Sequence, residues 1–403
     1  MGRWIVAAVA ALSLSVVSVA SADTGVPAYY KTPLPPGKTP GRRHGDVIRH
    51  KRIGGDPAVA GSGQTQLVIY RTEEGRGRAA PASGVVNLPK GRAPKGGWPV
   101  ITWAHGTTGA ADTCAPSLDS ARSPVHAYNA YIYPLITRWL KAGYAVVRTD
   151  YQGLGTEFDH EYLIGAAEGH SVLDMVRAAR QALPGKLSNK VVISGHSQGG
   201  HAALFAAAEA PKYTPELRVR GTVAFAPASH LDEQIPLTTS LTQPNAGLTA
   251  LVALIAHGLD VTWGDAGLSG RFSLPFWMTP AGIELSSRAA TECLPQLGAT
   301  ATRQGLTPAA LFKPDADFST LRPYLDQQDP TNLTIKTRVR IEQGSADTTV
   351  IPVFTDDLAR QLTTRGTPLT YNKVTGIDHA GITSGAGAAD ATRYIKKLLP
   401  PRR

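Results

Sequence analysis

One serine of this 403-residue chain lies in a segment whose residue types and spacing could support nucleophilic chemistry. The β-branched run Val191-Val192-Ile193 leads into Gly195-His196-Ser197-Gln198-Gly199, and an alanine-rich segment that could form a helix follows at once. This order predicts a strand, a sharp turn and a helix, with Ser197 at the tip of the turn as the candidate nucleophile. Glycines are expected on both sides because side chains there would collide with the neighbouring strand and helix. The pattern also occurs by chance in glycine-rich connections, so Ser197 needs partners elsewhere in the chain.

Two residues late in the chain could activate that serine. A serine hydroxyl needs an imidazole to take its proton and a carboxylate to orient the imidazole. Asp347 follows a predicted strand and His379 follows the next one. Because the carboxyl ends of parallel strands meet at one edge of a sheet, both side chains should project beside Ser197. We therefore predict that Ser197, Asp347 and His379 form a catalytic triad.

Other histidines and acids compete for these roles, but none follows a late strand. His196 is expected to pack beside the sharp turn, His201 to lie on the following helix facing strand or solvent, and His257 to belong to a later segment. The competing acids are expected to be helix caps or solvated carboxylates: Asp317, Asp356, Asp357 and Asp378.

Acyl transfer also needs two hydrogen-bond donors for the oxyanion of the reaction. The backbone N–H of Gln198, the residue after the nucleophile, is the first expected donor. The predicted strand Trp98 to Ala104 runs into the small-residue loop from His105 to Gly109, which frees further N–H groups. Thr107 is our choice for the second donor, with Gly106 and Thr108 as alternatives.

Strand and helix patterns alternate through most of the chain and predict an α/β fold. Strands are predicted over 64–70, 84–88, 98–104, 144–148, the β-branched run 191–193, 218–226, 335–342 and 367–374. Helices are predicted over 131–141, from a cap at Ser171 to about 183, after Ser197, over 353–362 and over 388–399. The alternation stops between 228 and 330, where apolar residues gather in Leu248 to Leu259 and around Trp277. Such a segment is better read as an inserted, mostly helical cap than as a structureless loop.

The N-terminus predicts export. Arg3, an apolar run from Trp4 to Ala20 and the small residues of Ala20-Ser21-Ala22 are typical of a cleaved secretory signal over residues 1–22, with an uncleaved membrane anchor as the alternative. No later segment is expected to be long and apolar enough to span a bilayer. In an oxidising compartment Cys114 and Cys293 can pair, and we predict that they do; two buried thiols are the alternative.

The net charge is +10, and much of it lies before residue 53 among prolines. Such a run could touch nucleic acid or an anionic surface, but no aromatic platform or nucleic-acid motif accompanies it. A solvated arm over residues 23–63 is therefore expected, followed by a core in two parts, 64–227 and 331–403, on either side of the cap at 228–330.

Several of these segments together resemble the secretory lipase family, which includes the fungal lipase A type and many secreted bacterial esterases. The resemblance rests on Asp46–Arg49, Trp103–Gly109 followed by Cys114–Ser117, Thr149–Gly155, Ser171–Asp174 and Gly195–Gly199. It implies an α/β-hydrolase fold, a mostly parallel central sheet flanked by helices with an inserted mainly helical cap. It also implies ester hydrolysis by a Ser-His-Asp triad, and it supports the Cys114–Cys293 disulfide.

The function expected from the sequence is that of a secreted carboxylesterase or lipase acting through an acyl-enzyme on Ser197. No cofactor, no metal and no nucleic-acid partner is expected; the substrate is a small-molecule or lipid ester, with transient contact with a lipid interface or anionic surface left open, as is the oligomeric state. The alternatives are a secreted serine peptidase, an acyltransferase, or a catalytically silent envelope-binding protein on the same fold.

Overall fold

The structure, a computed structural model, describes residues 26–31, 43–264 and 272–401. The predicted signal segment 1–22 lies outside the described residues. In the described residues nine strands form one sheet in the spatial order β1-β2-β3-β5-β4-β6-β7-β8-β9. Their bounds are β1 Val47–Arg52, β2 Ser62–Glu73, β3 Ala79–Pro89, β4 Trp98–Ala104, β5 Ala145–Gln152, β6 Leu187–His196, β7 Arg218–Phe225, β8 Val339–Gly344 and β9 Leu369–Val374.

The sheet is antiparallel at its start and parallel over the rest. Strands β1, β2, β3 and β5 pair antiparallel, whereas β5, β4, β6, β7, β8 and β9 pair parallel. Parallel strands are buried on both faces, which explains the continuous apolar runs of β4 and β6. The parallel part therefore brings the carboxyl ends of β4, β6, β8 and β9 to one edge.

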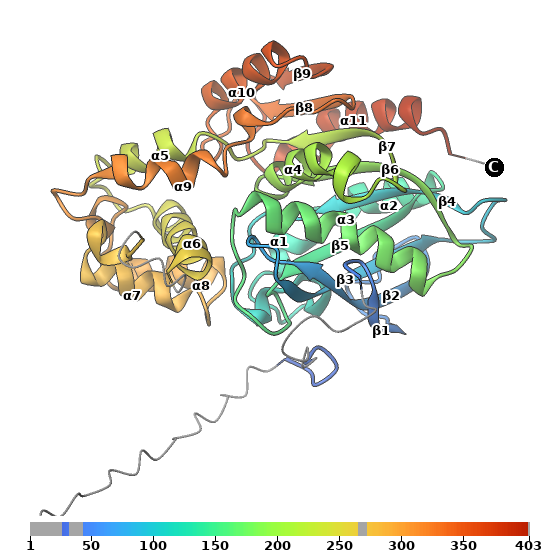
Figure 1. Ribbon diagram of the computed structural model, residues 1–403, viewed down its shortest axis with the longest axis horizontal. Helices are drawn as coiled ribbons and strands as arrows, with labels where there is room; N and C mark the ends of the chain where they lie inside the picture. Colours follow the sequence, from blue (N-terminus) through green and yellow to red (C-terminus); the bar gives the residue numbers. More distant parts are fainter. Residues whose placement is uncertain (1–25, 32–42, 265–271, 402–403) are drawn as a thin grey trace, which may run out of the picture.

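Helices cover both faces of the sheet (Figure 1). Side chains of α3, α4 and α10 join the core cluster on one face, and side chains of α2 and α11 join the cluster on the other. The bounds are α1 His126–Ala130, α2 Tyr133–Lys141, α3 Gly165–Ala182, α4 Gln198–Tyr213, α10 Pro352–Thr364 and α11 Gly385–Leu398. This is the predicted α/β-hydrolase architecture.

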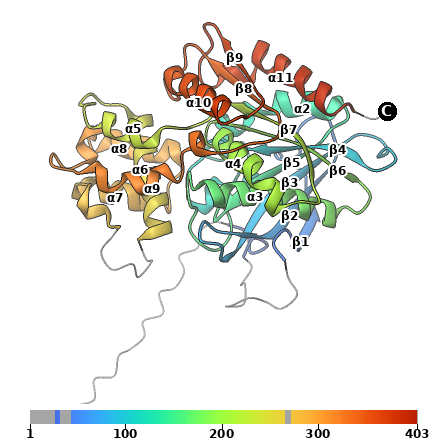
Figure 2. The same ribbon diagram turned by 45° about the horizontal axis from the view of Figure 1, so that its top comes forward.

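Between β7 and β8 the chain forms short and long helices that gather beside the sheet (Figure 2). They are α5 Leu231–Thr238, α6 Ala246–Trp263, α7 Pro280–Arg288, α8 Leu294–Arg303 and α9 Arg322–Asp326. We call residues 228–330 the cap. Its apolar side chains form a core cluster of their own, which also includes Tyr162, Leu163 and Ile164 of the loop before α3.

Helix α6 corrects one expectation from the sequence. Its 18 residues, with a mean hydropathy of 1.4, make it long and apolar enough to cross a membrane. More than half of the helix is buried, however, and it packs against α7 and α8 inside the cap. A core helix with this burial passes the same test of length and composition as a membrane span.

The N-terminal arm differs from its prediction. Residues 47–52, expected to be solvated, form the edge strand β1, which pairs with β2 from Val47↔Tyr70 to Arg52↔Gln66. Val26 and Tyr30 are buried against Leu67 and Ile69 of β2. The prediction failed because charged side chains are compatible with an exposed edge strand, where they point to solvent.

Two element boundaries near the site also differ. Ser171 was expected to cap its helix, but α3 begins at Gly165, and the Ser171 hydroxyl instead accepts a hydrogen bond from the Gln152 N–H at 3.2 Å. Strand β5 continues past Arg148 to Gln152 because residues 149–152 still pair with β3. The backbone of Tyr151, near the end of this strand, has a φ of +67°.

Candidate functional site

Ser197 lies at the junction of β6 and α4, at the carboxyl edge of the sheet. Its backbone is in the left-handed region (φ 58°, ψ −119°), and its N–H donates to the Phe225 carbonyl at 2.9 Å. A Cβ on Gly195 would lie 2.0 Å from the Gly199 carbonyl oxygen, and a Cβ on Gly199 would lie 2.0 Å from that of Ala104. Only glycine fits at either position. The turn thus stores backbone strain at one serine, as a nucleophile elbow does.

Asp347 and His379 are hydrogen-bonded to each other. The His379 Nδ1 lies 2.7 Å from Asp347 Oδ2, and the residues follow β8 and β9 respectively. The Asp347 side chain is fully buried, and its Oδ1 accepts two backbone N–H bonds, from Thr349 and Val350, both at 2.8 Å. Gln343 Nε2 donates to Oδ2 at 3.1 Å. These hydrogen bonds offset the desolvation cost of burying the Asp347 carboxylate. They also fix the direction in which it holds the imidazole.

His196 connects the His379 segment to the serine turn. Its Nε2–H donates to the His379 carbonyl at 2.8 Å, and the two rings lie 4.5 Å apart between centroids. Tyr131 O–H donates to the other ring nitrogen at 2.6 Å. Burial holds the pKa of His196 well below its usual value, so this ring is a neutral spacer. The predicted position of His196, packed beside the turn, agrees with this geometry.

The hydroxyl of Ser197 forms no hydrogen bond with His379 in the described part of the chain. Its side chain is largely buried, and His379, 16% exposed, is held next to the turn by the His196 contacts. Catalytic hydrogen bonds of an unliganded site are often long and tighten when substrate binds. The arrangement thus supplies a strained serine and a carboxylate-bound imidazole at the same edge.

The loop from His105 to Gly109 leaves β4 directly below the serine turn. Gly106 is closely packed there: a Cβ would lie 2.0 Å from the Tyr128 hydroxyl oxygen, so that this side chain would have to move, and 3.1 Å from the His196 carbonyl oxygen. Thr107 is buried, and its hydroxyl is 2.7 Å from the Tyr162 hydroxyl. Burial lowers the pKa of His105 to about 4, so its ring remains neutral at neutral pH.

The cap is fastened to this loop. Cys114 and Cys293 form the predicted disulfide, with Cα atoms 5.5 Å apart. Gly109 pairs with Cys293 in an isolated antiparallel bridge, and the Leu294 N–H donates to the Thr108 carbonyl at 2.9 Å. Within the cap an apolar pocket is lined by Ile235, Val252, Leu259, Phe272, Trp277 and Phe312 among others. All of these residues belong to the cap, so the pocket is part of the cap's own core.

A buried polar cluster lies behind the serine turn, and sequence reasoning missed it. Glu168 of α3 accepts a hydrogen bond from the side chain of Gln198, and His160 and His201 lie beside it. Because the helix was predicted to begin at Ser171, Glu168 was placed outside it. A predicted start one turn earlier would have put Glu168 and Ser171 on adjoining turns of one buried helix. His201, expected to face strand or solvent, is fully buried and donates its Nε2–H to the Gln328 carbonyl at 2.8 Å.

The remaining candidates lie in other environments. Asp317 accepts the Ser319 N–H and Asp378 accepts the Gly381 N–H, as expected of caps. Asp356 and Asp357 pair with cations, Lys373 and Arg360. His257, on α6, is buried, and burial lowers its pKa.

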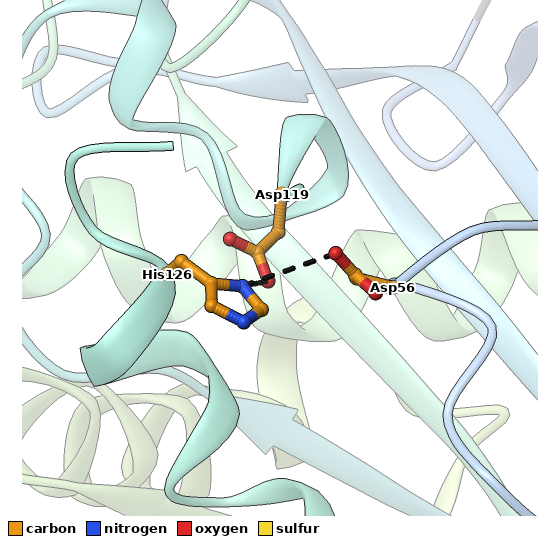
Figure 3. Close-up of side chains that lie close together, drawn as sticks. All are labelled: Asp56, Asp119 and His126. Atoms are coloured by element: carbon orange, nitrogen blue, oxygen red, sulfur yellow. Dashed lines mark hydrogen bonds and ion pairs between the residues drawn. The ribbon is translucent and has the colours of Figure 1, made fainter. Parts of the chain in front are cut away.

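Three side chains from separate segments could hold a metal ion. Asp56 Oδ2, Asp119 Oδ2 and His126 Nδ1 lie within 4.8 Å of one another (Figure 3). The His126 Nδ1 is 3.0 Å from Asp119 and 3.9 Å from Asp56, and Tyr133 O–H donates to Asp119 Oδ2 at 2.6 Å. Among the described residues, no hydrogen bond joins this cluster to Ser197, Asp347 or His379. The cluster is held together by its own ion pairs and hydrogen bonds.

Comparison with known protein families identifies one match. A family model described as secretory lipase matches residues 127–262, which include the serine turn. The expected resemblance to the secretory lipase family is therefore confirmed.

Two curated fungal relatives match over part of their length. Lipase A of Moesziomyces aphidis is 30% identical over 230 residues, 55% of this chain and 46% of the relative. A secreted triacylglycerol lipase of Malassezia furfur is 25% identical over 247 residues, 60% of this chain and 48% of the relative. The chain thus spans less than half the length of these relatives.

Solved structures share the fold over most of the chain. Candida antarctica lipase A in its closed state superposes with a TM-score of 0.72 at 20% identity, covering 88% of this chain and 82% of that one. A rice cell wall degrading esterase of Xanthomonas oryzae gives 0.66 at 21% identity, covering 89% and 96%. These likenesses establish the α/β-hydrolase fold.

Proposed function

From its likeness to the secretory lipase family, we propose that this chain is a secreted serine ester hydrolase that cleaves carboxylic, acyl-lipid-like esters. The observation that carries the proposal is the 2.7 Å hydrogen bond between His379 and buried Asp347, beside a serine held in the left-handed region. Ser197 is the nucleophile, His379 the general base and acid, and Asp347 the residue that orients the imidazole.

In the first half-reaction, the Ser197 Oγ attacks the ester carbonyl carbon while its proton passes to His379 Nε2. The C=O electron pair moves onto the oxygen, and the Gln198 N–H and an N–H of the Thr107 loop stabilise the resulting oxyanion. The tetrahedral intermediate then collapses, the bond to the alkoxy group breaks, and the proton held by His379 passes to the leaving oxygen. The products are a free alcohol and an acyl group on Ser197.

In the second half-reaction a water attacks the acyl carbon and gives a proton to His379. The same donors stabilise the second oxyanion, the bond to Ser197 Oγ breaks, and the proton returns to that oxygen. The carboxylic acid leaves and the free enzyme is restored. Asp347 does not take the proton in either half; its hydrogen bond to Nδ1 stabilises the imidazolium that forms each time.

The cap supports an acyl substrate. Apolar side chains such as those of Phe272 and Trp277 make up the core of the cap. Each methylene of an acyl chain buried against side chains of this kind would be worth about 0.8 kcal/mol. We propose that residues 228–330 act as a substrate-binding cap inserted between two parts of one catalytic core, 64–227 and 331–403. The predicted signal segment 1–22 and the secreted Malassezia relative support an extracellular location.

The test compares Ser197→Ala with Ser194→Ala. Ser194 lies three residues earlier in β6, and its buried hydroxyl has no hydrogen-bond partner in the part of the chain that the structure describes, so its removal should leave the site intact. We expect Ser197→Ala to lower kcat/KM for p-nitrophenyl esters by roughly 10⁴-fold or more, and to abolish labelling by a fluorophosphonate. Ser194→Ala should remain within about threefold of wild type. Equal turnover by Ser197→Ala and wild type would refute the proposal.

Three alternatives make different predictions in the same assays. Turnover of peptide amides in preference to esters would indicate a peptidase, and acyl transfer to an alcohol that outcompetes water would indicate an acyltransferase. A silent envelope-binding protein would show neither turnover nor labelling of Ser197. The hydrogen bonds donated to the buried Asp347 carboxylate favour a working triad over a catalytically silent protein. A buried carboxylate stabilised in this way is typical of a site that must orient an imidazole.

A further inference from the structure

We infer that Glu168 is a positioning residue that holds both proposed oxyanion donors in place. The inference rests on the proposed function and concerns its geometry. Glu168 lies in the first turn of α3, and its side chain is 1% exposed. It reaches the two donors along two separate chains of hydrogen bonds.

The first chain runs to the donor at the serine turn. Gln198 Nε2 donates to Glu168 Oε1 at 2.7 Å, and the same nitrogen lies 3.0 Å from His160 Nε2. His160 Nδ1–H donates to the Gln152 carbonyl at 3.0 Å, so its Nε2 is the acceptor. Both hydrogens of the Gln198 amide are therefore used, and this side chain is fixed at both of them. The proposed oxyanion donor is the backbone N–H of the same residue, Gln198, which is the first residue of α4. Fixing the side chain of Gln198 therefore also fixes the orientation of this N–H.

The second chain runs to the Thr107 loop. Glu168 Oε1 also accepts the backbone N–H of Leu163 at 2.9 Å. Leu163 has a φ of +58°, a conformation that costs a non-glycine residue about 1–3 kcal/mol and persists only where the surroundings hold it. The adjoining Tyr162 places its hydroxyl 2.7 Å from the Thr107 hydroxyl. One carboxylate oxygen thus fixes the strained turn that supports the second donor.

The orientation of the Gln198 side-chain amide costs free energy of folding. Its Oε1 is buried and has no hydrogen-bond partner among the described residues, which costs about 1–3 kcal/mol. Turning the amide over would give Oε1 the position opposite Glu168 Oε1, where two acceptors repel. The carboxylate therefore decides the orientation, which is the behaviour expected of a residue whose role is to position another group.

The same helix provides a matched control. Asp174, less than two turns further along α3, is also a fully buried carboxylate and accepts hydrogen bonds from Thr72 and Tyr213. None of its partners among the described residues belongs to the serine turn or to the loop 105–109. Removing Asp174 breaks a comparable buried network that does not lead to either donor.

The test measures kcat per serine titrated with a fluorophosphonate, so that only folded enzyme is counted. Glu168→Ala should lower kcat by about 10²–10³-fold, the effect of losing one oxyanion donor, with KM changed less than threefold. It should weaken binding of an alkyl boronate, which forms a tetrahedral adduct on serine, by a similar factor. Glu168→Gln keeps the acceptor oxygen and should remain within about fivefold of wild type. Asp174→Ala should lower the melting temperature while kcat per titrated serine stays within about threefold.

A second variant keeps the test informative if Glu168→Ala does not fold. Gln198→Met keeps the backbone donor and a side chain of similar length but breaks its bonds to Glu168 and His160; we expect kcat to fall about tenfold. Combined with Glu168→Gln, it should cost no more than the product of the two single effects, since Met no longer depends on the carboxylate.

Normal kcat per titrated serine in both Glu168→Ala and Gln198→Met would overturn the positioning role while leaving the proposed function intact. Absence of ester hydrolysis and of labelling in the wild type would instead overturn the proposed function.

Discussion

In both the His379–Asp347 pair and the His126–Asp119 pair, a ring Nδ1 lies close to a carboxylate oxygen, at 2.7 Å and 3.0 Å respectively. In both, the aspartate side chain is fully buried and the histidine is partly exposed. The pairs differ in what surrounds them. Asp347 receives two backbone N–H bonds on one oxygen. The corresponding Oδ1 of Asp119 is buried and has no hydrogen-bond partner within residues 26–31, 43–264 and 272–401.

The histidines also face different neighbours. The ring of His379 lies next to His196, the residue before the strained Ser197. His126 instead faces a second carboxylate, that of Asp56 at 3.9 Å (Figure 3). A hydrogen-bonded histidine and aspartate are therefore not by themselves a catalytic dyad. The backbone must also bring a nucleophile and oxyanion donors to the same edge of the sheet, and of the two pairs it is the His379–Asp347 pair that lies beside the proposed ones.

The largest effect is expected when the histidine of each pair, His379 or His126, is replaced by alanine. His379→Ala should lower kcat/KM for p-nitrophenyl esters by roughly 10⁵-fold, because no base remains to accept the serine proton. His126→Ala should leave kcat/KM within about twofold. Steady-state kinetics on matched preparations, checked for folding by circular dichroism, make the comparison. A loss of similar size in both variants would show that the two pairs cooperate.

Replacing each aspartate tests the acid partner alone. Asp347→Asn should reduce kcat by about 10⁴-fold, since an amide favours the wrong imidazole tautomer. Asp119→Asn keeps the volume of the carboxylate and should change kcat less than threefold while lowering thermal stability. The measurement is kcat together with the melting temperature. If Asp347→Asn retained more than a tenth of the activity, another acid would have to orient His379.

His160 differs from His379 and His126 because its side chain is wholly buried, and this difference predicts an effect of pH on stability. Burial lowers the pKa of His160 to about 3, against about 6.5 in the unfolded chain. Above pH 6.5 the His160 ring is neutral in both the folded and the unfolded chain. Its burial as a neutral ring therefore costs no stability at these pH values. As pH falls from 6.5 towards 3, the unfolded chain binds a proton that the folded chain refuses, so the free energy of unfolding drops by about 1.4 kcal/mol per pH unit.

The variant His160→Gln should remove the part of the pH dependence of the unfolding free energy that comes from His160. Urea denaturation at pH 7.5, 6.5 and 5.5 measures the slope for wild type and variant. We expect the variant to lose less stability between pH 6.5 and 5.5, by about 1 kcal/mol. Equal slopes would mean that His160 is protonated at similar pH in both states.

The smallest expected effect concerns metal. The triad proposal assigns no step to the cluster of Asp56, Asp119 and His126, so prolonged dialysis against EDTA should leave kcat/KM within about twofold. A loss of activity that Zn²⁺ or Ca²⁺ restores would instead connect this cluster to catalysis, and a fall in melting temperature alone would indicate a structural ion.

The arrangement around Ser197 followed from the sequence because it depends on local chemistry. The glycines at 195 and 199 are dictated by backbone contacts of 2.0 Å, and strand Trp98–Ala104 was predicted with its observed bounds. The positions of Asp347 and His379 followed from topology, since residues after parallel strands gather at one edge. Their hydrogen bond is thus a consequence of strand order.

The parts that escaped prediction depend on distant contacts. Strand β1 carries charged residues that are typical of a solvated arm, and only its pairing with β2 reveals it as part of the sheet. Glu168 is an acid in a segment that gives no apolar helix signal, and its burial is compensated by Gln198 and Leu163, 30 and 5 residues away. Such compensation is invisible until the fold brings the partners together.

The Cys114–Cys293 disulfide fastens the cap to the core by a covalent bond. The Gly109–Cys293 bridge and the bond from the Leu294 N–H to the Thr108 carbonyl attach the same part of the cap to the loop that carries Thr107. Because the two cysteines are 179 positions apart, the disulfide also restricts the unfolded chain. Reduction of this one bond should therefore lower the melting temperature of the whole protein.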